Sequence, residues 1–452
     1  MSSSYQVINP ANESIVTSIE LASVEAVDSA IEKADKAFRS WKLIPPGERA
    51  RLLRAFAQEV TNHRHELAAL EVKNSGHTIS NALWEADNVA NVLNYYSAAP
   101  ERLFGRQIPV PNGVDITFKE PLGVIGVIVP WNFPMPIAGW GFAPALAAGN
   151  TVLLKPAEYT PLTAIKLGEI ALKAGIPEGV FTVIPGKGSV VGNRFVTHPK
   201  VRKIVFTGST EVGKSIMAGC AQQVKRVTLE LGGKSANIIF ADSDVEKAAF
   251  VAPGAVFDNA GQDCCARSRI LVEKSVFEKF MAHFETAVKK FRVEDPSLTT
   301  SEMGPLISKK QYETVQTYLG EPVAFTGTAP TGKGFWMPPT VLQPQTTQSR
   351  SWREEIFGPV VSVMPFDDEA DAISKANDTD FGLSGSIWTR DSARALRVAR
   401  AVESGNLSVN SNSSVRYWTP FGGYKQSGLG RELGPDALDA FTEVKNVFIN
   451  TD

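Results

Sequence analysis

The hydrophobic and polar positions of the N-terminal part repeat with a helical period. From Val24 to Trp41, apolar side chains recur three or four positions apart, which predicts an amphipathic helix. Ser23 stands where a capping side chain is needed. The sequence PPG at residues 45–47 interrupts the pattern, and a second helix is predicted to begin near Glu48.

Beyond Gly123 the pattern changes to short, continuous apolar runs separated by helical segments. The first run, residues 124–129, ends at Pro130 and is typical of a strand buried on both faces. Similar runs follow at residues 152–154, 180–184 and 204–206, and a second series runs from 236–240 to Phe366. Strands alternating with helices predict parallel sheets covered by helices. We therefore expect an α/β fold with two such domains in series.

Three further segments refine this prediction. Residues 134–148 are apolar but contain proline and glycine and are short for a membrane span, so a buried helix is predicted. Residues 320–339 are rich in glycine and proline and predict a surface connection. The N-terminus lacks the basic and apolar regions of a signal peptide, and three cysteines are too few for a disulfide framework. The predicted location is the cytoplasm.

Composition and charge narrow the class of protein. The chain has 452 residues, of which 43% are apolar and 21% charged, as in soluble proteins of two or three domains. A net charge of −2 gives no electrostatic reason to expect nucleic acid or a membrane as a partner. The five histidines are scattered without ligand spacing, so no metal site is predicted.

Two adjacent cysteines, Cys264 and Cys265, end the loop sequence NAGQDCC at residues 259–265. A thiol is strongly nucleophilic near neutral pH when its surroundings favour the thiolate, and the carboxylate of Glu230 lies upstream. The alternative is a buried cysteine pair that packs as small hydrophobic side chains. Taken alone, the motif leaves both interpretations open.

Parallel sheets bind ligands at the carboxyl ends of their strands, which makes a nucleotide the natural ligand. The sequence GSTEVG (208–213) follows a strand and opens a helix, so it is favoured as the phosphate site. The sequence GKGSVVG (186–192) has one residue too many and is interpreted as a turn. Lys155 and Glu158 follow another strand and can bond ribose hydroxyls, and the carboxylate favours NAD over NADP. Alternatively, they are a solvated surface pair.

Seven ordered motifs carry a resemblance that covers nearly the whole chain. They are PWNFP (130–134), KPAE (155–158), FTGST (206–210), LELGG (229–233), GQDC (261–264), EEIFGP (354–359) and PFGGYK (420–425). In order and approximate spacing the chain resembles the aldehyde dehydrogenase superfamily. The resemblance implies NAD-dependent oxidation of an aldehyde to an acid through a cysteine thioester that water hydrolyses. Two rivals are an acylating enzyme that uses coenzyme A and a non-enzymatic relative.

The resemblance also implies roles for individual residues. Cys264 would be the nucleophile, Asn132 an oxyanion donor and Glu230 the base. The residues expected to contact NAD are Val129, Pro130, Trp131, Lys155, Glu158, Gly188, Gly192, Phe206, Thr207, Gly208, Ser209, Leu231, Gly232, Glu355 and Phe357. Those expected along the aldehyde tunnel or its mouth are Phe133, Trp140, Asp263, Arg416 and Phe421, with Asp258 and Val415.

Several of these residues have plainer interpretations. Asn132 alternatively caps the next helix, Glu355 is a surface carboxylate, and Phe357 is simple core. An unpaired Asp263 would oppose formation of the neighbouring thiolate. The substrate hints disagree, because aspartates suit an aminoaldehyde whereas Arg416 suits a semialdehyde carboxylate. Cys220 lies on no motif and is expected in a helix core.

Three parts are implied for each subunit of a homodimer or homotetramer. The NAD-binding domain would comprise residues 1–102 and 122–232 with 427–441, and the catalytic domain residues 233–426. Residues 103–121 and 442–452 would form an oligomerisation arm. The segment 318–339 is shorter than is usual in the family.

Overall fold

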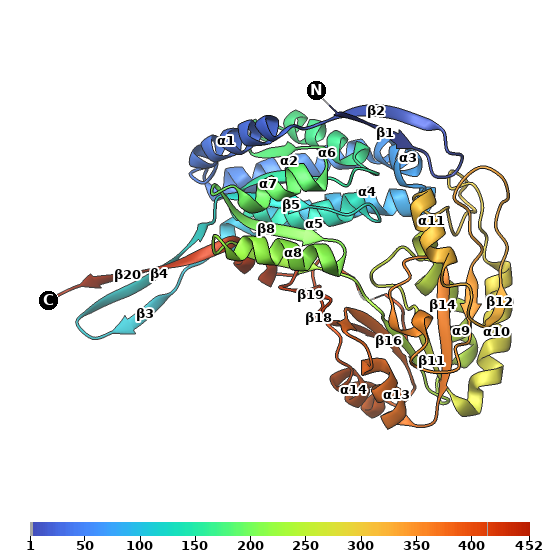
Figure 1. Cartoon of the computed structure of the whole chain (residues 1–452). Coiled ribbons are helices and arrows are strands. Elements are labelled where there is room, and N and C mark those ends of the chain that lie inside the picture. The colour runs from blue at the N-terminus through green and yellow to red at the C-terminus, as the bar shows by residue number, and fades with distance from the viewer. Residues whose placement is uncertain (1–2, 414) are drawn as a thin grey trace.

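The computed structural model describes residues 3–413 and 415–452, and it has two large helix-covered sheets and a projecting β arm (Figure 1). A two-stranded hairpin, β1 (Ser3–Ile8) and β2 (Ile15–Leu21), precedes them. The α/β fold class predicted from the sequence is confirmed.

The first large sheet has six strands in the order β19-β9-β8-β5-β6-β7. Its parallel strands are β5 (Val124–Ile128), β6 (Thr151–Lys155), β7 (Phe181–Val183), β8 (Val201–Thr207) and β9 (Arg226–Glu230). The short β19 (Gly428–Leu429) joins antiparallel to β9. All residues of β5 and β6 are buried, as their continuous apolar sequences predict.

Helices cover both faces of this sheet. They are α1 (Val24–Trp41), α2 (Pro46–Asn62), α3 (Arg64–Ser75), α4 (Ile79–Ser97), α5 (Pro134–Ala147), α6 (Leu162–Lys173), α7 (Asn193–Thr197) and α8 (Thr210–Ala221). Successive residues of β5 point to opposite cores: Ile125 packs with α5, whereas Val124 packs with α1. Ser23 caps α1 by accepting a hydrogen bond from Ala26 N–H at 3.3 Å. Every residue of α5 is buried, which confirms the buried helix predicted there.

The second large sheet has seven strands in the order β12-β13-β14-β11-β10-β16-β17. They are β10 (Ala236–Ile239), β11 (Arg269–Glu273), β12 (Val323–Thr326), β13 (Thr340–Leu342), β14 (Val360–Phe366), β16 (Ser384–Trp388) and β17 (Asn406–Val409). Only β12 is antiparallel to its neighbour. The prediction of a plain surface connection at 320–339 was therefore wrong in part, because those residues supply an edge strand.

The remaining elements surround the second sheet and join it to the first. The helices are α9 (Val245–Phe257), α10 (Phe277–Lys290), α11 (Lys309–Gln316), α12 (Arg350–Arg353), α13 (Glu369–Asn377) and α14 (Ser392–Ala401). Two short strands, β15 (Phe381–Gly382) and β18 (Tyr424–Lys425), pair with each other. Among residues 3–413 and 415–452, no helix combines the length and apolar character that crossing a membrane requires.

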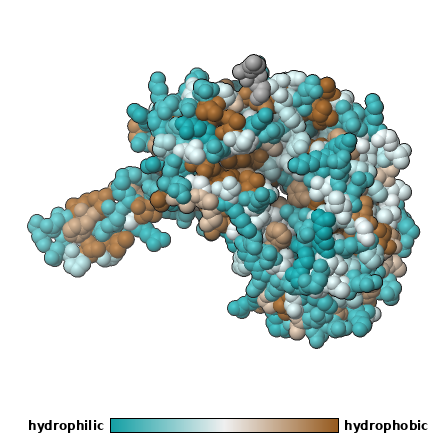
Figure 2. Space-filling model, viewed as in Figure 1, coloured by the Kyte–Doolittle hydropathy of each residue, from teal (hydrophilic) through white to brown (hydrophobic). Residues whose placement is uncertain are grey.

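The arm is a three-stranded antiparallel sheet that projects from the body of the molecule (Figure 1). It contains β3 (Gln107–Val110), β4 (Gly113–Pro121) and β20 (Thr442–Asn450), with β4 in the middle. Figure 2 shows an apolar patch on it. Its exposed apolar side chains are Ile108, Val114, Phe118, Val444, Phe448 and Ile449.

Candidate active site

The loop that carries Cys264 has an unusual backbone. It follows α9 through the turn η3 (Asp258–Gly261), in which Asn259, Ala260 and Gly261 have φ values of 48°, 55° and 70°. A Cβ on Gly261 would lie 2.0 Å from a carbonyl oxygen of the facing loop, so glycine is required there. Left-handed backbone at buried, non-glycine positions is costly and persists where surrounding contacts enforce it.

Hydrogen bonds from three directions enforce this conformation. The Asn259 amide donates to the carbonyl of Asn132 at 2.7 Å, and the Gln262 amide donates to the carbonyl of Asn259 at 3.0 Å. The backbone N–H of Ile307 donates to Gln262 Oε1 at 2.9 Å. The loop is therefore fixed against the segment before α5 and the segment before α11, and the position of Cys264 is fixed with it.

The two cysteines differ in exposure: Cys264 is half-buried and Cys265 is buried. A hydrogen bond with Cys265, burial and nearby negative charge raise the pKa of the Cys264 thiol well above its usual range. Asp263 is not unpaired, since its Oδ1 accepts a hydrogen bond from Cys265 N–H at 2.8 Å. Burial raises the pKa of Asp263 to about 6. Cys264 is therefore a protonated thiol until a group removes its proton.

Asn132 precedes α5 but does not cap it, since the N-cap residue is Phe133 and no side chain caps that helix. Its amide instead donates to the carbonyl of Gln262 at 3.0 Å. Gln262 lies two residues before Cys264, so this bond holds the amide beside the cysteine loop. The capping alternative for Asn132 is thereby excluded.

Glu230 is the last residue of β9 and is only 2% exposed. Neither carboxylate oxygen has a hydrogen-bond partner among the described residues. Burial and the neighbouring Glu432 raise the pKa of Glu230 well above its usual range. Burial likewise raises the pKa of Glu432 to about 8. Sequence reasoning missed Glu432, because nothing in its local sequence shows that it is buried beside Glu230.

Cys264 and Glu230 open on one cavity of about 330 Å³, which we call the inner cavity. Phe133, Trp140, Asp263 and Phe421 line it, as do Asp258 and Val415. Trp140 and Phe421 pack with ring centroids 5.3 Å apart. Arg416, by contrast, is exposed and lines neither this cavity nor its neighbour. Lining residues that sequence reasoning missed are Asn81, Trp84, Pro136, Ile137 and Cys265, together with Glu432.

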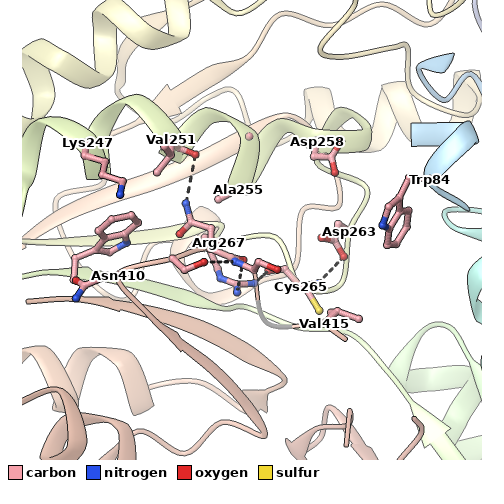
Figure 3. A pocket seen from close by; sticks show the side chains of 15 residues that line it. Trp84, Lys247, Val251, Ala255, Asp258, Asp263, Cys265, Arg267, Asn410 and Val415 are labelled. Carbon is pink, nitrogen blue, oxygen red and sulfur yellow. Dashed lines mark hydrogen bonds between the residues drawn. The ribbon is translucent and has the colours of Figure 1, made fainter. Parts of the chain in front are cut away.

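An outer cavity of about 630 Å³ (Figure 3) shares part of its lining with the inner one. Both cavities are lined by the same five residues, which we call the neck: Trp84, Asp258, Asp263, Cys265 and Val415. The neck joins α4, the cysteine loop and the segment after β17. It is the passage between the outer cavity and Cys264.

The residues predicted to hold the adenosine end lie at the carboxyl ends of β6 and β8. Lys155 ends β6, and its ammonium donates to the carbonyl of Pro156 at 3.0 Å. Glu158 accepts a hydrogen bond from Gly188 N–H at 3.0 Å. The sequence at 188–192 is therefore not a plain turn, because it forms a helical turn, η2 (Gly188–Gly192), that leads into α7.

The favoured glycine pattern has the structural context that it requires. Phe206 and Thr207 end β8, Gly208 follows, and the Ser209 hydroxyl caps α8 by accepting a hydrogen bond from Val212 N–H at 3.4 Å. Val129 N–H donates to the carbonyl of Lys155 at 3.0 Å, which aligns the ends of β5 and β6. These strand ends form one edge of the first sheet.

The residues predicted to hold the nicotinamide end come from loops beside both large sheets. Glu355 Oε1 accepts a hydrogen bond from Gly233 N–H at 2.8 Å, and a Cβ on Gly232 would lie 2.3 Å from that carboxylate. Glu355 is half-buried and hydrogen-bonded to the backbone rather than a free surface carboxylate, and burial raises its pKa to about 7. Phe357 packs edge-on against Trp131 with ring centroids 5.3 Å apart. The backbone N–H of Leu231 donates a hydrogen bond to the carbonyl of Ser427 at 2.8 Å.

A dinucleotide fits this arrangement for reasons visible in the residues themselves. A Cβ on Gly188 would meet nothing within 4 Å, which leaves open space beside Glu158. Lys155 is 5% exposed, and its ammonium bonds only a backbone carbonyl among the residues that the structure describes. Buried polar groups with spare capacity at a strand edge suit ribose hydroxyls.

A second buried cluster lies beside the inner cavity, where His77 Nδ1 contacts Glu85 Oε1 and Glu71 is adjacent. Burial alone would lower the pKa of His77, but the charge and hydrogen bond of Glu85 raise it to about 9. The His77 ring packs 5.4 Å from the ring of Phe133. The pair is therefore an ion pair behind the cavity wall, which the scattered histidines of the sequence gave no means to foresee.

Comparison with known proteins shows the family of the chain. Residues 1–447 match the sequence profile of the aldehyde dehydrogenase family. An aldehyde dehydrogenase of Emericella nidulans is 40% identical over 98% of this chain and 91% of its own. Betaine aldehyde dehydrogenase 1 of Oryza sativa is 39% identical over the same shares.

Solved structures show the same fold. A putative aldehyde dehydrogenase from Burkholderia cenocepacia has a TM-score of 0.97 and 37% identity, covering 100% of this chain and 94% of that one. Betaine aldehyde dehydrogenase from Staphylococcus aureus, in complex with NAD+, also has a TM-score of 0.97 and 37% identity, covering 100% and 92%. The chain belongs to the aldehyde dehydrogenase family, and it is an NAD-dependent oxidoreductase that oxidises aldehydes.

Proposed function

We propose that Cys264 is the nucleophile, Asn132 the oxyanion donor and Glu230 the general base of a hydrolytic aldehyde dehydrogenase. The observation that carries this proposal is the shared inner cavity. Cys264 and the unpartnered carboxylate of Glu230 line the same 330 Å³ space, although Glu230 ends strand β9 and Cys264 lies on the loop after α9. The amide of Asn132 is held against the cysteine loop at its edge.

The first half of the reaction forms a covalent adduct. Cys264 loses its proton, and the sulfur adds to the carbonyl carbon of the aldehyde to give a tetrahedral oxyanion. The Asn132 amide and the backbone N–H of Cys264 donate hydrogen bonds to that oxygen. One such donor lowers the barrier by about 3 kcal/mol. For this, the Asn132 amide turns from the Gln262 carbonyl, which keeps a second donor in Asn259 at 3.3 Å.

Bound NAD supplies the hydride acceptor for this chemistry. Glu355, fixed by Gly233 N–H, would orient the nicotinamide ribose, and Phe357 against Trp131 would close one side. Lys155 and Glu158 would hold the adenosine ribose at the other end. The carboxylate of Glu158 also opposes an additional 2′-phosphate, which favours NAD over NADP.

The second half of the reaction releases the acid. Glu230 accepts a proton from a water molecule that attacks the thioester at Cys264. A base works best when its pKa is near the working pH, and burial beside Glu432 moves the pKa of Glu230 in that direction. No step requires coenzyme A.

Rapid mixing with aldehyde and NAD tests these roles. Cys264→Ala should abolish NADH formation, whereas Cys265→Ala should retain it. Glu230→Gln should give one rapid NADH burst and then stall, because the thioester is not hydrolysed. Hydrolysis at the parental rate in Glu230→Gln, or acyl-CoA formed in preference to acid, would contradict the proposal.

The arm supports a homo-oligomer, either a dimer or a tetramer. Its exposed apolar side chains form patches on both faces of the projecting sheet, with Phe118 on one face and Phe448 on the other. Such patches on an otherwise polar surface mark association sites. Sedimentation of the protein and of a Phe118→Asp, Phe448→Asp variant tests this, since a monomeric parent would contradict it.

Two further predictions complete the proposal. The domain division is the one predicted from the sequence, with residues 1–102, 122–232 and 427–441 binding NAD and residues 233–426 carrying the nucleophile. The predicted location is the cytoplasm, because a reducing compartment keeps Cys264 and Cys265 as thiols. Imaging of a tagged chain tests the location.

A further inference from the structure

The inner cavity is lined by acidic side chains and by no basic one among the described residues. Four carboxyl groups line it, those of Glu230, Asp258, Asp263 and Glu432, and no lysine or arginine among the described residues does. The oxygens of Glu230 and Glu432 lack hydrogen-bond partners within residues 3–413 and 415–452, and these side chains are 2% and 4% exposed. Burying so many acids beside one another costs stability, which indicates a role in binding.

The two carboxylate oxygens of Asp258 differ in their hydrogen bonding. Its Oδ1 accepts both available hydrogen bonds, from the Asn81 amide at 2.5 Å and from Asn259 N–H at 3.0 Å. Oδ2 forms no hydrogen bond with any described residue. The loop therefore needs one oxygen at this position, and an asparagine would supply it. The second oxygen lies at the neck, and it carries negative charge when Asp258 is ionised.

The groups that face Asp258 do not cancel this charge. His77 is the nearest positive group, but it is already paired with Glu85 behind the cavity wall. In the outer cavity, the Arg267 guanidinium donates to Ser386 and to the carbonyls of Cys265 and Asn412. Lys247 lies on the far side of the outer cavity from the neck (Figure 3).

Aromatic faces accompany the acids. Trp84 stands at the neck beside Asp263 (Figure 3), and Phe133, Trp140 and Phe421 line the space within. Aromatic faces attract ammonium groups, most strongly where water is excluded. Arg416, the one residue that suited a carboxylate substrate, is exposed outside both cavities.

We propose that the neck selects aldehydes that carry an ammonium group, with Asp258 as the counter-ion and Trp84 as the aromatic face. The carbonyl carbon reaches Cys264 while the cation stays between the two cavities. Anionic aldehydes are rejected by the same carboxylates. This substrate class rests on the proposed role of Cys264. It adds a preference for cationic aldehydes, which the oxidation itself does not require.

Three aldehydes test the proposal: the cation 4-(trimethylammonio)butanal, the neutral isostere 5,5-dimethylhexanal, which matches it in size, and the smaller anion 4-oxobutanoate. The parent enzyme should have a kcat/KM for the cation at least about tenfold above that for the isostere, and the anion should be poorest. A smaller ratio, or a preference for the anion, overturns the proposal.

The variant Asp258→Asn should lower the ratio of kcat/KM for the cation to kcat/KM for the neutral isostere about tenfold, and the loss for the cation should appear mainly in KM. Glu246→Gln is the matched control, since it removes one exposed carboxylate from α9 outside both cavities and should change neither value. An unchanged cation preference in Asp258→Asn overturns the assignment. If that variant does not fold, the three-substrate comparison of the parent decides. Rapid oxidation of the isostere without cation preference would leave the proposed function standing, whereas no burst with any aldehyde would refute that function.

Discussion

Replacing Asn132 by alanine should separate catalysis from stability. The Asn132 amide is buried and holds the Gln262 carbonyl, but Asn259 also donates to that carbonyl at 3.3 Å. No acceptor is left unpaired, so the loss of one neutral hydrogen bond should cost about 1 kcal/mol of stability. The oxyanion loses a donor that nothing replaces, which costs about 3 kcal/mol, or 10²–10³ in rate.

The assay is stopped-flow NADH formation with a saturating aldehyde, together with thermal unfolding. The burst rate should fall about 10²–10³-fold, while the unfolding midpoint moves by no more than about 4 °C. Asn150→Ala is the control, because the buried Asn150 amide bonds Phe441 O at 2.9 Å and Ala145 O at 3.1 Å away from the cavity. It should lower the midpoint and leave the burst rate unchanged. A loss below about tenfold for Asn132→Ala would refute the oxyanion role.

Three other predictions follow from charge and backbone. Glu432→Gln removes a negative neighbour of Glu230, so the rise of acid release with pH should move to lower pH, as a pH–rate profile will show. The folded pKa of His77, about 9, lies above its ordinary value of 6.5, so its stabilisation is complete below about pH 6.5 and is lost as the pH rises toward 9. His77→Leu should therefore abolish the fall of the unfolding free energy between about pH 7 and 9, and it should cost about 3 kcal/mol near neutrality by leaving Glu85, whose pKa burial raises to about 7, without its partner. Gly261→Ala should cost at least about 2 kcal/mol in denaturant titrations, because its Cβ would meet a carbonyl oxygen at 2.0 Å; parental stability would show that the loop adapts.

The sequence predicted those helices and strands whose formation and burial depend on the local pattern of apolar residues. Strand β5 and helix α5 are continuous apolar segments, and both are fully buried as expected. Strand β12 was missed because it is short, mostly exposed and set among glycine and proline, and only pairing with β13 makes it a strand. Its existence depends on a neighbour that local pattern does not reveal.

In the active site, too, features that depend on local sequence were predicted, whereas features that depend on distant parts of the chain were not. Ordered motifs pointed to Cys264 and Glu230, which line one cavity. The carboxyl group that raises the pKa of Glu230 could not be predicted, because Glu432 comes close to Glu230 only after folding. The orientation of Arg416 could not be predicted either. Its charge suited a substrate carboxylate, but the folded chain places Arg416 at the surface.

The wall of the inner cavity combines residues as far apart in the sequence as Asn81 and Glu432. A fragment that lacks either residue therefore cannot enclose the cavity, and partly folded forms in which only one sheet is complete will have no enzyme activity. During refolding, NADH production should lag behind the recovery of helical signal. Enzyme activity is thus a sensitive report of the last assembly step, more so than any spectroscopic measure of secondary structure.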